Sequence, residues 1–543
     1  MALSKEVYQA LEDIVGPSNI SDDPATLDSY AYQWAAELSQ RGSKFMPRPE
    51  AALLPGSTEE VQAIVRACNR YKIKCKAYST GWGSYAAPLK EGVLQLDLRR
   101  MDRILEIDER NMFAVIEPYV TGAQLQAEAM KVGLNTHMVG SGSSCSVLAA
   151  CTSFLGPGPD SIFLGHSNEN LLAMEWVMPK GDILRTGSLG SGIGWFCGEG
   201  PGPSLRGLAK GRRGAWGGLG VFTKCAVKLS PWPGPPIMPV EGVAPVYSSP
   251  LPENFRSYTL AFPTMDAYAE AYYKIYDADI GYIAHRQFNC MGEETWLAFL
   301  MRFIDPSKTT DDIEELLKTP EIQKATEEAK RSFQLVLAGM TLRDIEYQKK
   351  ALTEILDETG GKIVTKMAEP AIEKFTLLYL IKLCFKEINM GLAGTYVGSF
   401  AQHGTPDFLV STLYPAAKET LGRHQQKGLI ANTGADSMMA AVSGLGGGGD
   451  CTFEQFCHFD PHDKESVKGA LAYYADAARA ARERGMHGGL EDCYREITKE
   501  ELEESRHVAP QPAIYTYQRK IKEALDPNDI GDGSYIAKEE VKY

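Results

Sequence analysis

The most constraining feature of the sequence is a glycine-rich loop, AYSTGWGSYAAP, at Ala77–Pro88. It follows a helix-like run at Ser57–Tyr71 and a short apolar segment at Ile73–Ala77, so a helix and a strand-like segment lead directly into the loop. Gly81 and Gly83 permit turns with positive φ, and consecutive N–H groups in such a turn can converge on an anion. The loop lacks both the G-x-G-x-x-G pattern and a Gly-Lys-Ser/Thr ending. Alone, it predicts either a phosphate cradle or an ordinary hairpin turn.

The segments after the loop raise the weight of the phosphate interpretation. Three short strand-like runs, a helix and a second Gly/Ser turn, VGSGSSCSVLAAC, come next, and Phe163–Gly187 has the pattern of a strand pair ending in small residues. A glycine-rich segment covers Gly202–Leu229, and IKEALDPNDIGDGSYI covers Ile521–Ile536. In this order the motifs resemble the FAD-binding domain of the vanillyl-alcohol oxidase and p-cresol methylhydroxylase superfamily, nearest its glycolate oxidase and D-lactate dehydrogenase branch.

The resemblance implies an α+β fold with two domains, which suits a chain of 543 residues. We expect a two-subdomain FAD-binding domain of the p-cresol methylhydroxylase type and an α+β substrate or cap domain with an antiparallel sheet. The expected boundaries are a helical arm at 1–45, the FAD-binding domain at 46–231, the cap at 242–520, and a C-terminal segment, 521–543, that returns to the FAD-binding domain. A proline-rich stretch at Ser230–Gly242 marks the linker.

The resemblance also implies FAD and a set of small or polar residues around it. Covalent attachment through His or Tyr occurs in the superfamily, but no motif here fixes a linked residue, so we expect noncovalent FAD. Three turns carry these residues: Ser79, Thr80, Gly81, Trp82, Gly83, Ser84, Tyr85 and Pro88 in the first; Gly140, Ser141, Gly142, Ser143, Ser144 and Ser146 in the second; Gly217, Gly218, Gly220 and Val221 in the third. The serines of the second turn have an alternative role as caps of a helix that starts near Val147. For the glycines, ordinary strand turns are the competing interpretation.

Oxidation of a 2-hydroxy acid on a flavin needs a cation for the carboxylate and an acceptor for the hydroxyl proton. We select Arg286, on a predicted cap strand, for the carboxylate, and His487 and His403 for proton transfer or hydrogen bonding; structural roles are the alternatives. The D-lactate group holds a metal through H-x-G-D-G-N-x-H and E-H-G patterns. Here Val410 and Met486 replace two of those ligands, so we expect no metal. Other histidines either face the flavin or are structural: His137, His166, His285 and His458.

The function implied is an FAD-dependent oxidoreductase that oxidises a small hydroxy acid or alcohol by hydride transfer to the flavin. Its electrons would pass to a protein acceptor or to oxygen. Loss of the metal pattern leaves two alternatives open. One is a phenol- or benzylic-alcohol-oxidising enzyme of the vanillyl-alcohol oxidase type, and the other is an FAD electron-transfer subunit of a larger complex.

The net charge and the cysteine pattern limit the kinds of partner that this protein can bind. A net charge of -14 argues against nucleic acid, which requires a basic surface, but suits a basic electron carrier. The eleven cysteines form no C-x-x-C pair, so we expect no iron–sulfur cluster within this chain. The partners that the resemblance allows are an electron-transferring flavoprotein, an iron–sulfur subunit or a second copy of the chain. With no membrane-spanning apolar run and no secretory signal, we expect a cytoplasmic protein.

Overall fold

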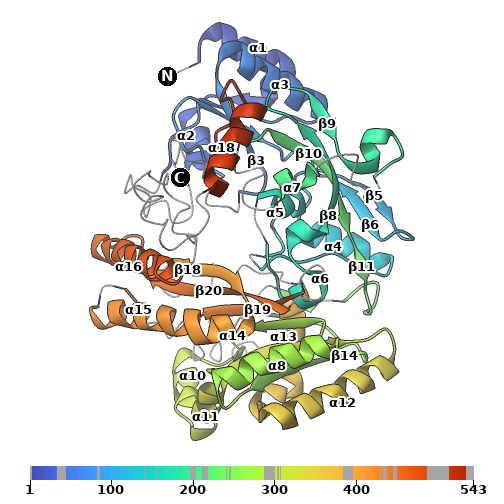
Figure 1. Ribbon diagram of the computed structural model, residues 1–543, viewed down its shortest axis with the longest axis vertical. Helices are drawn as coiled ribbons and strands as arrows, with labels where there is room; N and C mark the ends of the chain where they lie inside the picture. The colour runs from blue at the N-terminus through green and yellow to red at the C-terminus, as the bar shows by residue number, and fades with distance from the viewer. Residues whose placement is uncertain are drawn as a thin grey trace.

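The computed structural model divides into an N-terminal domain and a cap domain built around one large sheet (Figure 1). The described residues are 3–32, 45–81, 86–140, 142–153, 156–195, 204–210, 218–239, 241–243, 246–286, 300–301, 305, 307–382, 395–428, 430–431, 437–443, 449–485 and 513–533. The predicted α+β class is confirmed, because parallel and antiparallel sheets occur together with helices in separate layers.

The first layer of the N-terminal domain is a small sheet in the order β1-β2-β4-β3, with helix α3 packed against it. The apolar pattern explains α3, because Val61, Ile64 and Cys68 recur at helical spacing and are all buried. Ser57 caps the helix by accepting a hydrogen bond from the N–H of Glu60. The elements of this layer are α1 (Lys5–Val15), η1 (Pro17–Asn19), β1 (Ile20–Ser21), α2 (Pro24–Ala31), β2 (Ala51–Leu53), α3 (Thr58–Tyr71), β3 (Lys74–Tyr78) and β4 (Val93–Asp97).

The second layer is an antiparallel sheet in the order β5-β6-β10-β8-β9. A buried carboxylate joins it to the first layer: Glu175 of β8 accepts hydrogen bonds from Thr58 of α3 and from Lys224 of β10, both at 2.7 Å. Its elements are β5 (Ile104–Asp108), β6 (Phe113–Ile116), α4 (Gly122–Lys131), β7 (Leu134–Asn135), α5 (Val147–Ser153), α6 (Ser161–Leu164), η3 (Ser167–Asn170), β8 (Leu171–Val177), β9 (Ile183–Arg185), η4 (Gly187–Ser191), α7 (Arg206–Ala209), β10 (Val221–Lys228) and β11 (Ser230–Pro231).

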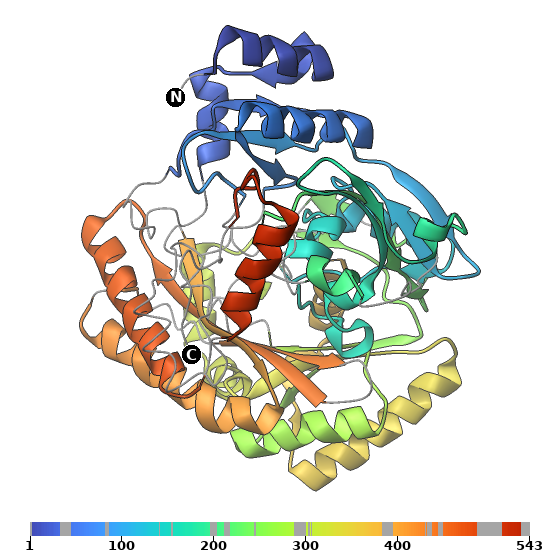
Figure 2. The ribbon, with the colours of Figure 1, turned by 45° about the horizontal axis from the view of Figure 1, so that its top comes forward.

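The cap is a seven-stranded antiparallel sheet in the order β17-β14-β16-β15-β19-β20-β18. Helices α8, α12, α15 and α16 lie on the side of this sheet away from the N-terminal domain (Figure 2). The cap elements are β12 (Glu241–Val243), β13 (Val246–Ser248), β14 (Phe255–Ala261), α8 (Met265–Asp277), β15 (Ile283–Arg286), α10 (Thr310–Leu317), α11 (Pro320–Ala329), β16 (Ser332–Ala338), α12 (Leu342–Thr359), β17 (Lys362–Ile363), η7 (Thr365–Ala368), α13 (Pro370–Lys382), β18 (Thr395–Gly404), α14 (Pro406–Phe408), η9 (Leu409–Leu413), α15 (Tyr414–Gln426), β19 (Ser437–Ser443), β20 (Gly449–Phe459) and α16 (Lys464–Arg482).

Strand alternation gives the cap sheet two faces of different character. Cys451 and Phe453 of β20 pack in one apolar core with Tyr473 of α16, and we call this helix-covered side the outer face. On the opposite, inner face, Val336 of β16 packs in one core with Trp232 at the end of the N-terminal domain. The inner face is therefore the side of the cap that meets the N-terminal domain.

The C-terminal segment crosses back to the first layer. Helix α18 (Ala513–Leu525) leads to a short extended stretch that runs beside β3 (Figure 1). Cys75 of β3 donates its N–H to the carbonyl of Ile530 at 2.7 Å, and its carbonyl accepts from the N–H of Asp532 at 3.0 Å. Among the described helices, none is both long and apolar enough to cross a bilayer.

Candidate functional site

The first two predicted cofactor turns meet in space. The N–H of Ser146, in the second turn, donates to Oγ1 of Thr80, in the first, at 3.1 Å. The Ser146 hydroxyl also accepts from the N–H of Ala149 at 3.0 Å, so it caps helix α5, as one of the sequence interpretations proposed. Two turns that lie far apart in the sequence thus border one region of the N-terminal domain.

The second turn has the shape that a closely approaching ligand requires. Gly142 has a φ of +115°, and a Cβ placed there would meet no atom within 4 Å, so open space lies beside the turn. Gly140 donates its N–H to the carbonyl of Pro157 at 2.9 Å, and Ser143 accepts at its carbonyl from Ala123 at 2.9 Å. Ser144 follows these anchored residues and is half-buried. The anchored backbone and the open space fit a cofactor phosphate or ring approaching the glycine.

The third turn is tied to the C-terminal segment. Lys522 Nζ donates to the carbonyl of Gly218 at 2.8 Å and to that of Gly531 at 3.1 Å. Gly220, just before Val221 begins β10, must be glycine, because a Cβ there would lie 2.2 Å from the carbonyl oxygen of Val177. This turn and the first turn therefore border the same C-terminal stretch.

The far end of the first turn reaches the same stretch. Leu89, which follows Pro88, donates its N–H to the Asp532 carboxylate at 2.8 Å. Ser79 and Gly81 begin this turn directly after β3, and Gly81 has a φ of +73°. Seven predicted site residues lie outside the described residues: Trp82, Gly83, Ser84, Tyr85, Ser141, Gly217 and His487.

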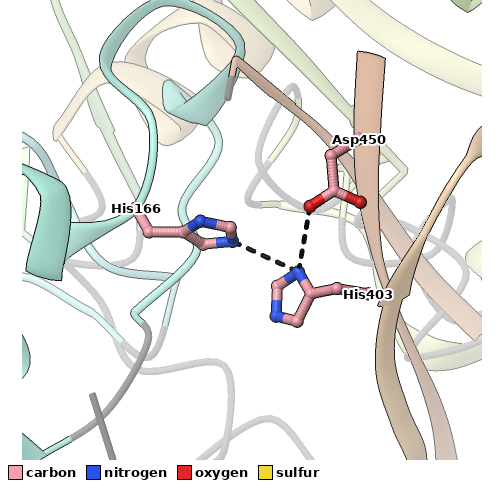
Figure 3. A group of neighbouring side chains, drawn as sticks. All are labelled: His166, His403 and Asp450. Atoms are coloured by element: carbon pink, nitrogen blue, oxygen red, sulfur yellow. Dashed lines mark hydrogen bonds and ion pairs between the residues drawn. The ribbon is translucent and has the colours of Figure 1, made fainter. Parts of the chain in front are cut away.

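Two histidines and an aspartate come together where the N-terminal domain meets the cap, and we call them the junction cluster: His166, His403 and Asp450 (Figure 3). His166 Nε2 lies 3.2 Å from His403 Nδ1, and His403 Nδ1 lies 3.7 Å from Asp450 Oδ2. His166 comes from the N-terminal domain, whereas the other two come from cap strands β18 and β20. The cluster therefore links the two domains with groups that hold protons or metal ions.

Local structure fixes each member of the junction cluster. His166 precedes η3, where its backbone N–H donates to Glu169 at 3.0 Å and its carbonyl accepts from Asn170 at 2.8 Å. His403 is paired with Thr452 in the β18–β20 ladder, so Asp450, two residues along β20, lies diagonally next to it on the same face. Burial raises the pKa of Asp450. Burial alone would raise the pKa of Glu169 too, but hydrogen bonds from His166 hold it below its usual value.

A row of residues extends from His403 across the inner face. Ladder pairing places Thr452, Ala440, His285 and Gln334 successively opposite one another on β20, β19, β15 and β16. The row contains no lysine or arginine. Burial lowers the pKa of His285 to about 3, so this imidazole is neutral at physiological pH. This row is therefore mostly polar and carries no fixed positive charge, and His285, Gln334 and Thr452 in it are buried.

Arg286 lies on the other face of the same strand. It is paired with Met439, its guanidinium carbon lies 5.5 Å from the centre of the Tyr414 ring of α15, and its side chain is fully buried. Because successive side chains of a strand point to opposite faces, Arg286 points to the outer face while His285 points to the inner one. Of the three catalytic residues predicted from sequence, the structure thus places His403 in the junction cluster and Arg286 away from it.

The comparisons with known proteins bear on the N-terminal domain most directly. A family model described as an FAD binding domain matches residues 49–187, the span that contains the first two turns and His166. Glycolate oxidase subunit GlcD of Bacillus subtilis is 26% identical over 232 residues, which cover 42% of this chain and 46% of that protein. The N-terminal domain of this chain is therefore similar to the FAD binding domains of FAD-linked oxidases. The predicted family and the predicted cofactor, FAD, are confirmed.

Two further proteins extend the likeness. The flavoprotein subunit of 4-cresol dehydrogenase (hydroxylating) from Pseudomonas putida is 30% identical over 192 residues, 34% of this chain and 36% of that protein. A 4-ethylphenol oxidase from Gulosibacter chungangensis superposes with a TM-score of 0.71 over 99% of both chains at 20% identity, and so confirms the p-cresol methylhydroxylase type of fold. The sequence matches span less than half the length of these curated relatives.

The sequence offered little to identify two members of the junction cluster. His166 stood among several histidines without a motif, and Asp450 ends the run SGLGGGGD, which has the composition of a loop. The usable signal was that this run separates two strand-like segments, so that Asp450 begins a strand. Which strand would lie next to it depends on the long-range pairing of β18 with β20.

Proposed function

We propose that this protein oxidises the hydroxyl-bearing carbon of a small, uncharged alcohol at the junction of its two domains. FAD, when bound, accepts the hydride from that carbon. The observation that carries the substrate class is the row on the inner face, in which no lysine or arginine stands and His285 is neutral. A substrate carboxylate would need a cation there, and Arg286 points to the opposite face.

In this proposal the N-terminal domain binds the cofactor and the cap domain contributes to the substrate site. The backbone of the first two turns, joined by Thr80 and Ser146, holds the cofactor through N–H groups next to Gly142. The third turn, fixed by Lys522, closes the cofactor site from the C-terminal side. The cap supplies the opposite wall, where His403 presents a polar group at the domain boundary. Substrate oxygen would bind at this boundary, with its carbon towards the N-terminal domain.

A matched pair of substrates tests the charge argument. Anaerobic reduction of the flavin is followed by its visible absorbance with a 2-hydroxy acid and with the methyl ester of the same acid. The two compounds share the reacting carbon and differ in the carboxylate charge. We expect faster reduction by the ester, by about 10-fold or more if an unpaired carboxylate must be desolvated. Faster reduction by the acid would contradict the proposed neutral substrate and return the assignment to hydroxy acids.

A second candidate is oxidation of a 4-alkylphenol or 4-hydroxybenzyl alcohol. It is favoured by the neutral row, together with the relatives that act on 4-cresol and 4-ethylphenol by name. Benzyl alcohol and 4-hydroxybenzyl alcohol form the pair that separates it from the first candidate, because they differ only in the phenolic hydroxyl. If flavin reduction requires that hydroxyl, the enzyme recognises phenols.

The electron acceptor is a separate question with its own measurement. The 4-cresol dehydrogenase relative is named as a flavoprotein subunit, which supports a partner protein, whereas the ethylphenol relative is named as an oxidase. Rates of reoxidation of the substrate-reduced flavin by oxygen and by an electron-transferring flavoprotein would distinguish the two. A flavin that only a protein partner reduces would indicate an electron-transfer subunit.

A further inference from the structure

The junction cluster has the composition and spacing of a metal site. We propose that His166, His403 and Asp450 bind a divalent transition-metal ion of the zinc class. The three ligand atoms, two imidazole nitrogens and one carboxylate oxygen, all lie within 4.8 Å of one another. They come from three separate elements of two domains, so the fold, and not a local motif, assembles them.

The distances match those of a tetrahedral site. Zinc binds imidazole nitrogen and carboxylate oxygen at about 2.0–2.2 Å, which places neighbouring ligand atoms about 3.3 Å apart. In the junction cluster the nitrogens of His166 and His403 are 3.2 Å apart, and His403 Nδ1 is 3.7 Å from Asp450 Oδ2. A metal ion between these atoms therefore requires only small side-chain adjustments. A hydrogen bond between the two imidazoles is the alternative use of the same geometry.

The surroundings supply the outer contacts that a metal site needs. Glu169 Oε1 lies 3.8 Å from His166 Nδ1, the ring nitrogen turned away from the cluster, in the carboxylate–histidine arrangement that orients metal-bound imidazoles. The N–H of Cys451 donates to Oδ1 of Asp450 at 2.9 Å, which leaves Oδ2 directed towards His403. The hydrogen bond from Cys451 restrains Asp450 before an ion binds, and the backbone hydrogen bonds with Glu169 and Asn170 restrain His166.

Among the described residues three protein ligands surround the site, and such a set leaves a coordination position for water or substrate. The side chains of His166, His403 and Asp450 are 10%, 25% and 34% exposed, so water or a substrate oxygen can reach an ion held between them. Imidazole with one carboxylate favours zinc, iron or cobalt over magnesium or calcium, which prefer oxygen ligands. The ligand set differs from the H-x-G-D-G-N-x-H and E-H-G pattern, of which the sequence retains too little to predict a metal.

The role of the ion rests on the proposed function. A hydroxyl oxygen of the substrate would occupy the open position, and the ion would polarise the O–H bond so that the proton leaves to water. The electron pair of the adjacent C–H bond then leaves as hydride to FAD, and the carbon–oxygen single bond becomes a carbonyl. With the proton taken by water and the hydride by FAD, the balance needs no further oxidant. The ion itself is neither oxidised nor reduced.

Metal content of the tag-free, FAD-loaded protein tests the site directly. The protein is stripped with a chelator, dialysed against Zn²⁺ or Co²⁺, and examined by elemental analysis and by electron paramagnetic resonance of Co²⁺, to which oxidised FAD contributes no signal. We expect one ion per chain, lost in His166→Gln and Asp450→Asn. His462→Gln, which changes an exposed histidine of the cap, is the matched control and should retain the ion. Glu169→Gln should weaken affinity by about 10–100-fold.

Each outcome decides one part of the proposal. Wild-type protein that takes up no stoichiometric ion, or variants that retain it with unchanged affinity, would overturn the metal site. FAD content and thermal midpoint show whether each variant is folded, and the wild-type Co²⁺ signal does not depend on any variant. Unchanged flavin reduction in the stripped protein would overturn the catalytic role. A bound Co²⁺ ion with a flavin that no hydroxyl compound reduces would instead refute the proposed function and leave the site standing.

Discussion

The buried carboxylate of Glu175 joins the two layers of the FAD-binding domain. It is 3% exposed and accepts from Thr58 at 2.7 Å, from Lys224 at 2.7 Å and from Arg185 at 2.9 Å. Glu175→Gln keeps the shape but removes the charge and turns an amide group towards one of the cations. Thr58 begins α3, which precedes β3 and the first cofactor turn. The substitution should therefore lower both the stability of the domain and its affinity for FAD.

The expected loss of stability in Glu175→Gln follows from the solvent exposure of the two cations that pair with Glu175. Removing one partner of a fully buried ion pair costs about 3–5 kcal/mol. Arg185 is 52% exposed and Lys224 is 25% exposed, so solvent screens both ion pairs and we expect about 2 kcal/mol for Glu175→Gln. With an unfolding entropy of about 2.1 cal/mol/K per residue and a cooperative unit of about 180 residues, this lowers the thermal midpoint by about 5 °C.

The effect should depend on pH in a defined direction. Burial alone would raise the pKa of Glu175, but the hydrogen bonds from Lys224, Thr58 and Arg185 outweigh it and hold the pKa below its usual value. The carboxylate therefore stabilises the fold above the unfolded pKa of about 4.3, and this stabilisation is lost as the pH falls through the lower folded pKa. The difference between wild type and variant should shrink as the pH falls from 6 towards 3.5.

Differential scanning calorimetry of the FAD-loaded proteins measures this difference. Glu128→Gln is the matched control, because Glu128 makes an ion pair with Lys131 in which both side chains are about half exposed, and we expect a change within about 0.5 kcal/mol. If Glu175→Gln shifts the midpoint no more than Glu128→Gln, or if its shift does not diminish at low pH, the reasoning about this buried carboxylate is refuted.

Two further substitutions test how the cofactor turns are held. Gly158→Ala would place a Cβ 1.9 Å from the carbonyl oxygen of Met138, a residue that leads into the second turn. We therefore expect this variant to be destabilised by about 1–3 kcal/mol and to bind less FAD. Gly207→Ala is the control, because a Cβ there would meet no atom within 4 Å, and its FAD content should be unchanged. Lys522→Met removes a buried ammonium group that donates hydrogen bonds to two backbone carbonyls. This variant should release FAD faster, as measured by flavin fluorescence. Lys520→Met, at an exposed position of the same helix, should release FAD at the wild-type rate. Equal FAD retention in either pair would contradict these assignments.

Local features of the sequence predicted the secondary structure next to the first two turns. The helix expected at Ser57–Tyr71 is α3 at Thr58–Tyr71, because capping and apolar spacing are properties of neighbouring residues. The second turn is followed by a helix that Ser146 caps, for the same reason. The contact between Thr80 and Ser146 required the family resemblance, since no local rule joins residues that are so far apart in the chain.

The cap half of the site was beyond local rules. Alternation predicts that neighbouring residues of a strand point to opposite faces, but it does not say which face meets the other domain. Arg286 was selected because it lies on a predicted cap strand, and the structure turns its side chain towards the helices and that of His285 towards the FAD-binding domain. His403 was selected from a partial motif, and its neighbour Asp450 became apparent only from the register of β18 with β20.

The central claim is that this chain binds FAD and uses it to oxidise a small hydroxyl compound at the domain boundary. The most direct measurement is an anaerobic absorbance titration of the purified protein, first to establish one FAD per chain and then with neutral alcohols, hydroxy acids and 4-alkylphenols in turn. The account predicts that the flavin band is bleached by a neutral hydroxyl compound with a stoichiometry of one substrate per flavin. A protein that takes up no FAD, or an FAD band that none of these compounds bleaches, would contradict it.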